Sequence, residues 1–255
     1  MRLISFLLCL IPINFCLSQQ EFFENKTEKQ LYNFNAFKAG EKLEYRLNYG
    51  FFNASYASLT LKDEVLDGKK VLRATSIGRT TGLARLFFKV DDIYETFFPK
   101  EKVKPVKSIR DIYEGGYERE AETIYDYKNN KALFYDKLKN IKKEFDIHPD
   151  IQDIISTFYY LRKHFDISSL KPNDLIYVDI FFDKEIYPFK MMFLGIERIK
   201  TKFGIVECMK LRPYMESGRV FRDNEGIKIW VTNDDNRVPI KVKADLRVGS
   251  IVANL

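Results

Sequence analysis

The segment "KLEYRLNYG", residues 42–50, decides the fold class of this chain. Leu43, Tyr45, Leu47 and Tyr49 fall on one face of an extended backbone, and charged or polar residues fall between them. This period of two is typical of a β-strand that buries one face and leaves the other in water. The segment therefore predicts an antiparallel sheet with one solvated face.

Strand-like segments recur along most of the chain. Asp67-Gly68 joins two extended arms and predicts a tight hairpin, and Asn129-Asn130 predicts a second turn. The further segments are "GYEREAETIYDY" (116–127), "KALFYD" (131–136), "DLIYVDIFF" (174–182), "YPFKMMFLG" (187–195), "GIVECMKLRP" (204–213), "GIKIWV" (226–231) and "VPIKVKADL" (238–246). Short connections between alternating segments predict a mainly β protein, built as an antiparallel curved sheet or an open, half-barrel meander.

One segment has the period of a helix. In "HPDIQDIISTFYYLRKHF", residues 148–165, apolar side chains recur every three or four positions. They are Ile151, Ile154, Ile155, Phe158, Leu161 and Phe165. Asp150 is the expected cap. The pattern predicts one amphipathic helix of four to five turns, packed over the curved sheet or closing one of its mouths.

The first residues predict export. "MRLISFLLCLIPINFCLSQQ" has one basic residue, Arg2, before an apolar run that is too short for a comfortable membrane span. We expect a signal peptide over residues 1–18, cleaved after Ser18, and a periplasmic protein with no transmembrane segment in its mature chain. A polar lead-in over 19–36 and a single antiparallel β domain over 37–255 complete the expected organisation.

Cysteine content and charge agree with an exported protein. Two of the three cysteines lie in the predicted signal, so Cys208 is expected to be a buried, unreactive thiol. The formal net charge of +6 favours anionic lipid head groups or polyanionic glycans over nucleic acid in that compartment. The basic run "KLKNIKK", residues 137–143, is expected in a solvated loop.

No motif identifies a reaction. A nucleophile elbow, a glycine-rich phosphate loop and a dinucleotide fingerprint are all missing. His148 and His164 are too far apart for a zinc-binding helix pair, although linear order alone leaves a Ser-His-Asp triad open. We therefore predict no catalytic residue, no metal ligand and no cofactor.

Two acidic pairs need a separate test. The pair Asp234-Asp235 lies in "TNDDNR", residues 232–237, which has no glycine for a calcium loop and is expected to be a hairpin turn. Asp91-Asp92 lies in a strand, where adjacent side chains point to opposite faces. Neither pair is expected to converge on one ion.

Aromatic residues are abundant, with 22 Phe and 15 Tyr. They either fill the core or line a cavity for a lipid-like ligand, with the helix as its lid. The candidate ligand-binding residues are Arg79 and Arg85 for an anionic head group, Leu86, Phe87 and Phe88 for an acyl portion, and Phe158 and Leu161 on the helix. The alternative for residues 79–88 is a solvated loop between two strands.

The chain resembles the domain-of-unknown-function 3108 family of exported bacterial proteins. The resemblance is carried by "FKAGEKLEYRLNYG" (37–50), "GRTTGLARLFFKVDDIYETFF" (78–98), "IRDIYEGGYERE" (109–120) and "IWVTNDDNRVPIKVKADLRVGSIVANL" (229–255). It implies a periplasmic, mostly antiparallel β protein and supplies no catalytic residue. The architecture is similar to that of outer-membrane lipoprotein carriers (LolA/LolB-like folds).

Three functions stay open at this stage. The first is a non-enzymatic binding or carrier protein for an apolar or amphipathic envelope molecule. The second is a structural or interaction protein that docks an envelope protein or glycan. The third is a hydrolase acting on glycan or lipid, in which Asp91, Asp92, Glu95 and Glu114 converge in a cleft.

Overall fold

A computed structural model describes residues 35–165, 169–214 and 226–255. The predicted signal peptide and most of the predicted lead-in lie outside these residues, although Ala36, at the end of that lead-in, is buried. The strands are β1 (Lys42–Tyr49), β2 (Phe52–Leu66), β3 (Lys69–Thr80), β4 (Val90–Phe98), β5 (Lys107–Glu114), β6 (Tyr117–Asp126), β7 (Lys131–Asp136), β8 (Ile141–Asp146), β9 (Leu175–Phe182), β10 (Glu185–Thr201), β11 (Gly204–Pro213), β12 (Ile227–Thr232), β13 (Pro239–Asp245) and β14 (Ser250–Asn254). The helices are α1 (Gly82–Phe87) and α2 (Ile154–His164).

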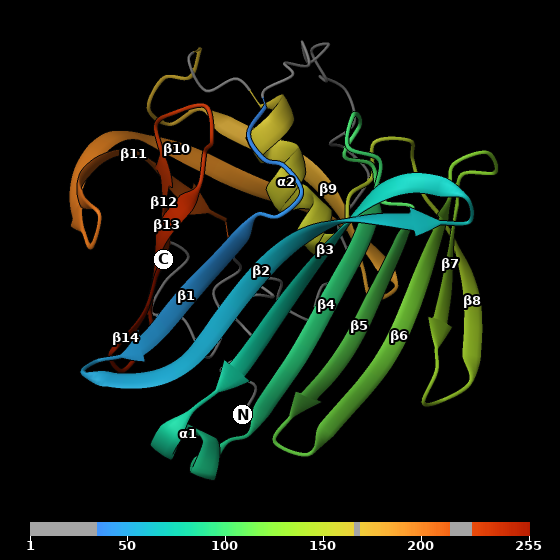
Figure 1. Ribbon diagram of the computed structural model, residues 1–255, viewed down its shortest axis with the longest axis horizontal. Coiled ribbons are helices and arrows are strands. Elements are labelled where there is room, and N and C mark those ends of the chain that lie inside the picture. Colours follow the sequence, from blue (N-terminus) through green and yellow to red (C-terminus); the bar gives the residue numbers. More distant parts are fainter. Residues whose placement is uncertain (1–34, 166–168, 215–225) are drawn as a thin grey trace.

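All fourteen strands belong to one antiparallel sheet, in the order β8-β7-β6-β5-β4-β3-β2-β1-β14-β13-β12-β11-β10-β9. Strands that follow each other in sequence are paired, except for β8 and β9, and β1 pairs with β14 as well as with β2. Strands β8 and β9 are the two edges of the sheet, and the segment that contains α2 connects them. The sheet curls without closing into a barrel (Figure 1). The predicted fold, a curved antiparallel sheet with one helix packed against it, is confirmed.

Side chains tie the two ends of the curled sheet together. Asp183, in the turn between β9 and β10, forms ion pairs with Arg110 on β5, at 3.1 Å, and with Arg119 on β6. The same strands also meet through aromatic side chains: the rings of Tyr125 on β6 and Phe181 on β9 pack edge to face, with their centroids 6.3 Å apart. The curl is therefore fixed by contacts between β5, β6 and the β9–β10 hairpin.

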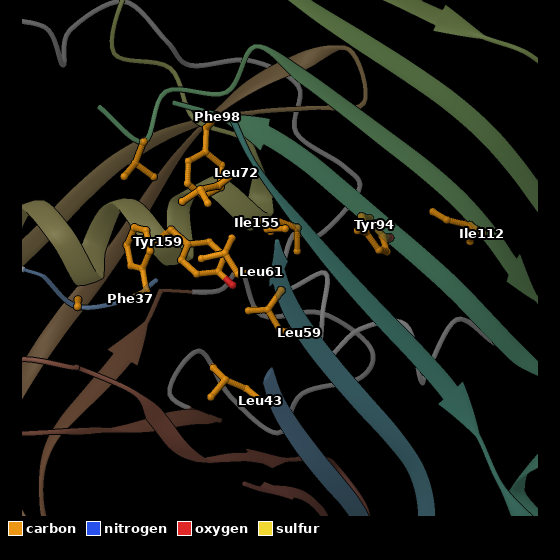
Figure 2. Packing of buried hydrophobic residues seen from close by; sticks show 13 residues of the cluster. Phe37, Leu43, Leu59, Leu61, Leu72, Tyr94, Phe98, Ile112, Ile155 and Tyr159 are labelled. Carbon is orange, nitrogen blue, oxygen red and sulfur yellow. The ribbon is translucent and has the colours of Figure 1, made fainter. Parts of the chain in front are cut away.

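Helix α2 occupies the inner side of the curl, where its side chains form part of the core (Figure 2). Tyr159 is fully buried, and its ring lies 4.8 Å from that of Phe37 and 5.4 Å from that of Phe98. Leu61 and Leu72 complete this cluster from β2 and β3. The aromatic residues of this region thus fill a core.

Helix α2 is shorter than predicted and begins at a different cap. Asp153, not Asp150, is the cap: its carboxylate accepts a hydrogen bond from the Ser156 amide, and the Ser156 hydroxyl accepts one from the Asp153 amide. Residues before this cap are extended, because Gln152 pairs in parallel with Ile180 of β9. Tertiary pairing therefore overrides the helical spacing of Ile151.

Several local predictions are confirmed. Asp67-Gly68 turns the β2–β3 hairpin with φ values of 49° and 74°, as a two-residue turn of this kind requires. "TNDDNR" is the β12–β13 turn, in which Asp234 accepts hydrogen bonds from the backbone amides of Asn236 and Arg237. Cys208 is fully buried on β11, and burial raises the pKa of its thiol to about 11.

Candidate functional site

The predicted site segment "RTTGLARLFF" contains a helix that the sequence analysis did not anticipate. Residues Gly82–Phe87 form α1, which joins β3 to β4, so this segment is not a plain loop. None of the six residues of α1 is buried, and the side chains of Leu86 and Phe87 are 80% and 87% exposed. Helix α1 therefore presents apolar side chains to the outside of the protein.

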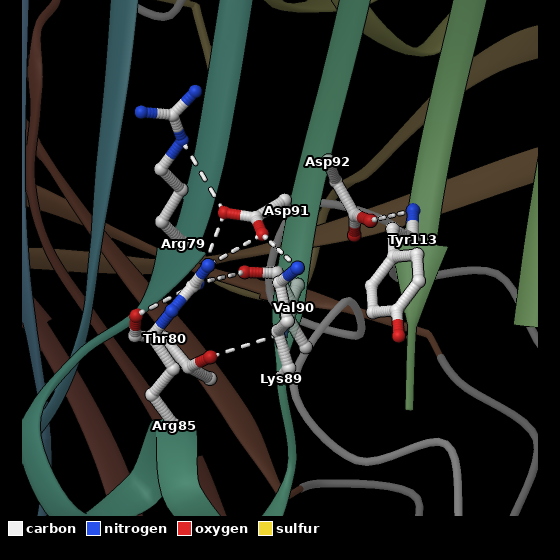
Figure 3. A network of polar contacts seen from close by, with 8 residues as sticks. All are labelled: Arg79, Thr80, Arg85, Lys89, Val90, Asp91, Asp92 and Tyr113. Atoms are coloured by element: carbon white, nitrogen blue, oxygen red, sulfur yellow. Dashed lines mark hydrogen bonds and ion pairs between the residues drawn. The ribbon is translucent and has the colours of Figure 1, made fainter. Parts of the chain in front are cut away.

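Three cations surround one carboxylate beside α1 (Figure 3). Arg85 donates from its two terminal nitrogens, Nη1 and Nη2, to the two carboxylate oxygens of Asp91, at 3.0 and 2.7 Å. Arg79 and Lys89 approach the same carboxylate at 3.5 and 3.6 Å. The hydrogen bond from Arg85 lowers the pKa of Asp91 below its ordinary value. We call Arg79, Arg85, Lys89 and Asp91 the cationic cluster; it carries an excess of positive charge and is partly exposed.

The strand pairing explains this convergence. Arg79 is the direct partner of Asp91 in the β3–β4 ladder, and α1 returns Arg85 to the same place. Both arginines were predicted from the sequence as ligand-binding residues, whereas Lys89 and the role of Asp91 were not. A β3–β4 register would have indicated the pair, since residues opposite each other in an antiparallel ladder are neighbours.

The four acids of the hydrolase hypothesis do not form one site, because Asp92 and Glu114 are buried on the inner face of the sheet whereas Asp91 and Glu95 lie on the outer face. Asp91 lies on the outer face, whereas Asp92 is buried on the inner face and accepts a hydrogen bond from the Tyr113 amide (Figure 3). Glu95 accepts hydrogen bonds from Arg73 and Thr75 on β3. Asp91 and Asp92 thus point to opposite faces, as the strand pattern predicted.

The remaining predicted site residues fall into separate places. Phe88 packs against the backbone of Gly115 in the β5–β6 turn, where any added side chain would overlap its ring. Phe158 and Leu161 lie on α2 and pack against buried clusters. The predicted residues near α1 are therefore far from those on α2. The nine residues of β4, which runs from α1 to the region of α2, span roughly 25 Å. The predicted ligand-binding set is therefore not one site.

A small pocket lies where α2 meets the seam of the curled sheet. The space between its walls is about 330 Å³ with open solvent included, but the cavity itself measures only about 20 Å³. Its walls include Arg110, Asp153, Ile155, Phe182 and Asp183. A cavity of this size holds about one water molecule, so this depression is not a site for a lipid or another small molecule.

The buried carboxyl of Asp153 makes folding sensitive to pH. Burial raises its pKa from 3.8 to about 6, against the hydrogen bonds from Ser156 and Thr96. Because the folded form holds this proton more tightly than the unfolded form, the contribution of Asp153 to stability falls as pH rises from about 4 to 6. We expect Asp153→Asn to remove roughly 1–3 kcal/mol of that pH dependence in urea unfolding measured across this range. An unchanged slope would contradict the assignment.

No group of three or more His, Cys, Asp or Glu side chains in residues 35–165, 169–214 and 226–255 is placed to hold a metal ion. In the same residues, no helix is both long enough and apolar enough to cross a membrane.

Comparison with known proteins identifies the family. Residues 44–255 match the family described as "Protein of unknown function (DUF3108)". The chain belongs to this family. The membership confirms the resemblance inferred from the four sequence segments. Curated proteins gave no match to this DUF3108 protein.

Two solved structures are similar to this chain. A β-barrel-like protein of the domain-of-unknown-function family DUF1849 from Brucella abortus is similar, with a TM-score of 0.52 and 9% identity, covering 84% of this chain and 94% of that one. A DUF1089 family protein from Pseudomonas aeruginosa has a TM-score of 0.39 and 13% identity, covering 73% and 88%. The first likeness supports the fold of the DUF3108 protein and carries no activity.

Proposed function

We propose that this DUF3108 protein is an exported, periplasmic, non-enzymatic protein that binds an amphipathic, lipid-like molecule of the cell envelope. The ligand contact is at α1. The observation that carries the proposal is the cationic cluster beside the exposed Leu83, Leu86 and Phe87. An anionic head group suits the cluster, and an apolar chain suits α1.

The chemistry of the cluster favours a phosphate or carboxylate. Arg79, Arg85 and Lys89 share the single carboxylate of Asp91, so an added anion would relieve their mutual repulsion. Guanidinium groups match both oxyanions with paired hydrogen bonds. The inner face of the sheet is filled by α2 and the core, so we place the ligand outside the curl rather than beneath a helical lid.

Calorimetry with a soluble lipid tests this proposal. The exported protein, purified without detergent, is titrated with dihexanoylphosphatidylglycerol kept below its micelle concentration. We expect binding that is at least about tenfold weaker in the double variant Arg79→Gln/Arg85→Gln, since a hydrogen bond to a charged group contributes about 1.5–3 kcal/mol. Native mass spectrometry of the untreated protein then asks whether a lipid copurifies.

Two controls make the titration specific. Arg198→Gln removes an exposed arginine from β10, far along the sheet from α1, and is expected to leave binding unchanged. Dihexanoylphosphatidylcholine, whose head group has no net charge, is expected to bind more weakly to every variant. Equal binding of the two lipids, or equal binding by the arginine variant, would overturn the proposal.

A further inference from the structure

Five chain reversals gather exposed apolar side chains at one end of the sheet. They are the β1–β2 turn, α1, and the β5–β6, β7–β8 and β13–β14 turns, which lie along the lower margin of Figure 1. Their exposed apolar residues, which we call the apolar rim, are Tyr49, Phe51, Phe52, Leu83, Leu86, Phe87, Tyr117, Leu138 and Val248. The rim combines parts of the chain that are far apart in sequence.

Backbone and side-chain contacts join most of the rim into one structure. The Tyr49 hydroxyl donates to the carbonyl of Val248 at 3.0 Å, which holds the β1–β2 and β13–β14 turns together. The Thr81 amide donates to the carbonyl of Ala54, and the Gly115 amide donates to that of Lys89. These contacts connect α1 to β2 on one side and to the β5–β6 turn on the other.

The fold does not require apolar side chains at these tips. Turns at the opposite end of the same strands use Asp67-Gly68, Asn129-Asn130 and Asn233–Asn236, the residues that turns ordinarily favour. Exposed apolar residues at that end include Val65, near the β2–β3 turn, and Phe203 and Ile205, at the β10–β11 turn. Phe51, by contrast, is 104% exposed at its tip and packs against nothing. Large apolar side chains exposed on several neighbouring turns at one end of a sheet point to an interaction surface there.

The charge of the rim selects its partner. The segments 49–53, 79–91, 115–117, 137–140 and 246–249 contain six Lys and Arg residues and one Asp. Part of the basic run, Lys137 and Lys139, lies here, in the β7–β8 turn, before Ile141 begins β8. Exposed apolar side chains on separate turns, surrounded by Lys and Arg residues, are suited to the surface of an anionic bilayer. At such a surface, aromatic side chains insert among the lipid head groups and basic side chains contact the phosphates.

We propose that the apolar rim docks this protein on the surface of an anionic lipid bilayer, with the strands of β1 to β6 rising from the membrane. The inference rests on the proposed function in taking α1 as a lipid contact. It extends that contact to four further turns and names the bilayer surface, rather than a single lipid, as the partner.

Vesicle flotation tests the docking. The exported protein is mixed with phosphatidylethanolamine vesicles containing phosphatidylglycerol, and with phosphatidylcholine vesicles for comparison. We expect preferential binding to the anionic vesicles that weakens with added salt, and at least about tenfold weaker binding for Phe51→Ser/Val248→Ser. Phe203→Ser, which removes an exposed phenylalanine at the opposite end, is the matched control and is expected to bind as the native protein does.

Fluorescence locates the inserted residue. Tryptophan placed by Phe51→Trp is expected to shift its emission to shorter wavelength on anionic vesicles, whereas Phe203→Trp is expected to show no shift. The native Trp230 is buried and supplies a constant background in both variants. Equal behaviour of the two variants would overturn the proposal.

The two proposals fail separately. Phe51 and Val248 lie outside the cationic cluster, so Phe51→Ser/Val248→Ser is expected to leave calorimetric binding of the soluble lipid unchanged. Binding of soluble lipid without vesicle binding would overturn the docking proposal and leave the proposed function standing. Self-association that is lost in Phe51→Ser/Val248→Ser, with no vesicle binding, would show that the rim joins copies of this chain and would also overturn the docking proposal.

Discussion

Replacing Phe98 with alanine is expected to lower the free energy of unfolding by about 3–5 kcal/mol. Phe98 is fully buried at the end of β4, where its ring meets those of Phe37 and Tyr159 (Figure 2). Its removal leaves a cavity between the sheet and α2, and neighbouring rings fixed by both elements cannot fill it. Urea unfolding followed by circular dichroism measures the loss.

The matched control for this variant is Phe51→Ala. The same atoms are removed, but from a side chain that is wholly exposed, so a change within about 0.5 kcal/mol is expected. A similar loss in both variants would contradict the assignment of Phe98 to a core that α2 completes. It would also imply that Phe51 packs against the protein, which would weaken the docking proposal.

The sheet could be predicted because its signals are local. Leu43 and Leu47 are buried and Lys42, Glu44 and Arg46 are exposed, as the alternation in "KLEYRLNYG" required. Tyr49 was expected on the buried face but is 40% exposed, because β1 ends there. Turn residues such as Asp67-Gly68 act through their own backbone preferences, so the hairpins followed as well. The curl itself depends on ion pairs of Asp183 across the seam, which no short segment of the sequence reveals.

The helices show where local patterns fail. The start of α2 was placed too early because the pairing of Gln152 with Ile180 joins parts of the chain that only the fold brings together. Helix α1 was missed because six residues are too few to display a period. The first error comes from a contact made elsewhere in the fold, and the second comes from the shortness of the helix.

The candidate site was predictable only in part. Arg79 and Arg85 do meet, because β3 and β4 are neighbours and α1 is short. Phe158 and Leu161 lie at the other end of the strands, and nothing in their spacing states which end of the sheet α2 occupies. The apolar rim combines five reversals, so it emerges only when the strand order is known.

Replacing Arg162 with methionine is expected to lower the free energy of unfolding by about 3–5 kcal/mol. Its buried guanidinium on α2 binds both carboxylate oxygens of Glu41 at 2.7 Å and donates to the carbonyls of Ala36 and Asn236. In the variant, the mostly buried carboxylate of Glu41 and the carbonyls of Ala36 and Asn236 lose their hydrogen-bond donor. Water cannot fully replace this donor in a buried site, so the unpaired groups destabilise the folded state.

An exposed ion pair supplies the comparison that identifies burial as the cause. Lys42 and Glu44 lie 2.9 Å apart on β1 with side chains more than half exposed, so Lys42→Met is expected to cost no more than about 1 kcal/mol. The double variant Glu41→Met/Arg162→Met should be less destabilised than the sum of the single changes, because neither buried charge is then left alone. Equal losses for Arg162→Met and Lys42→Met would show that α2 is not anchored through this arginine, and that packing around Tyr159 alone holds the helix inside the curl.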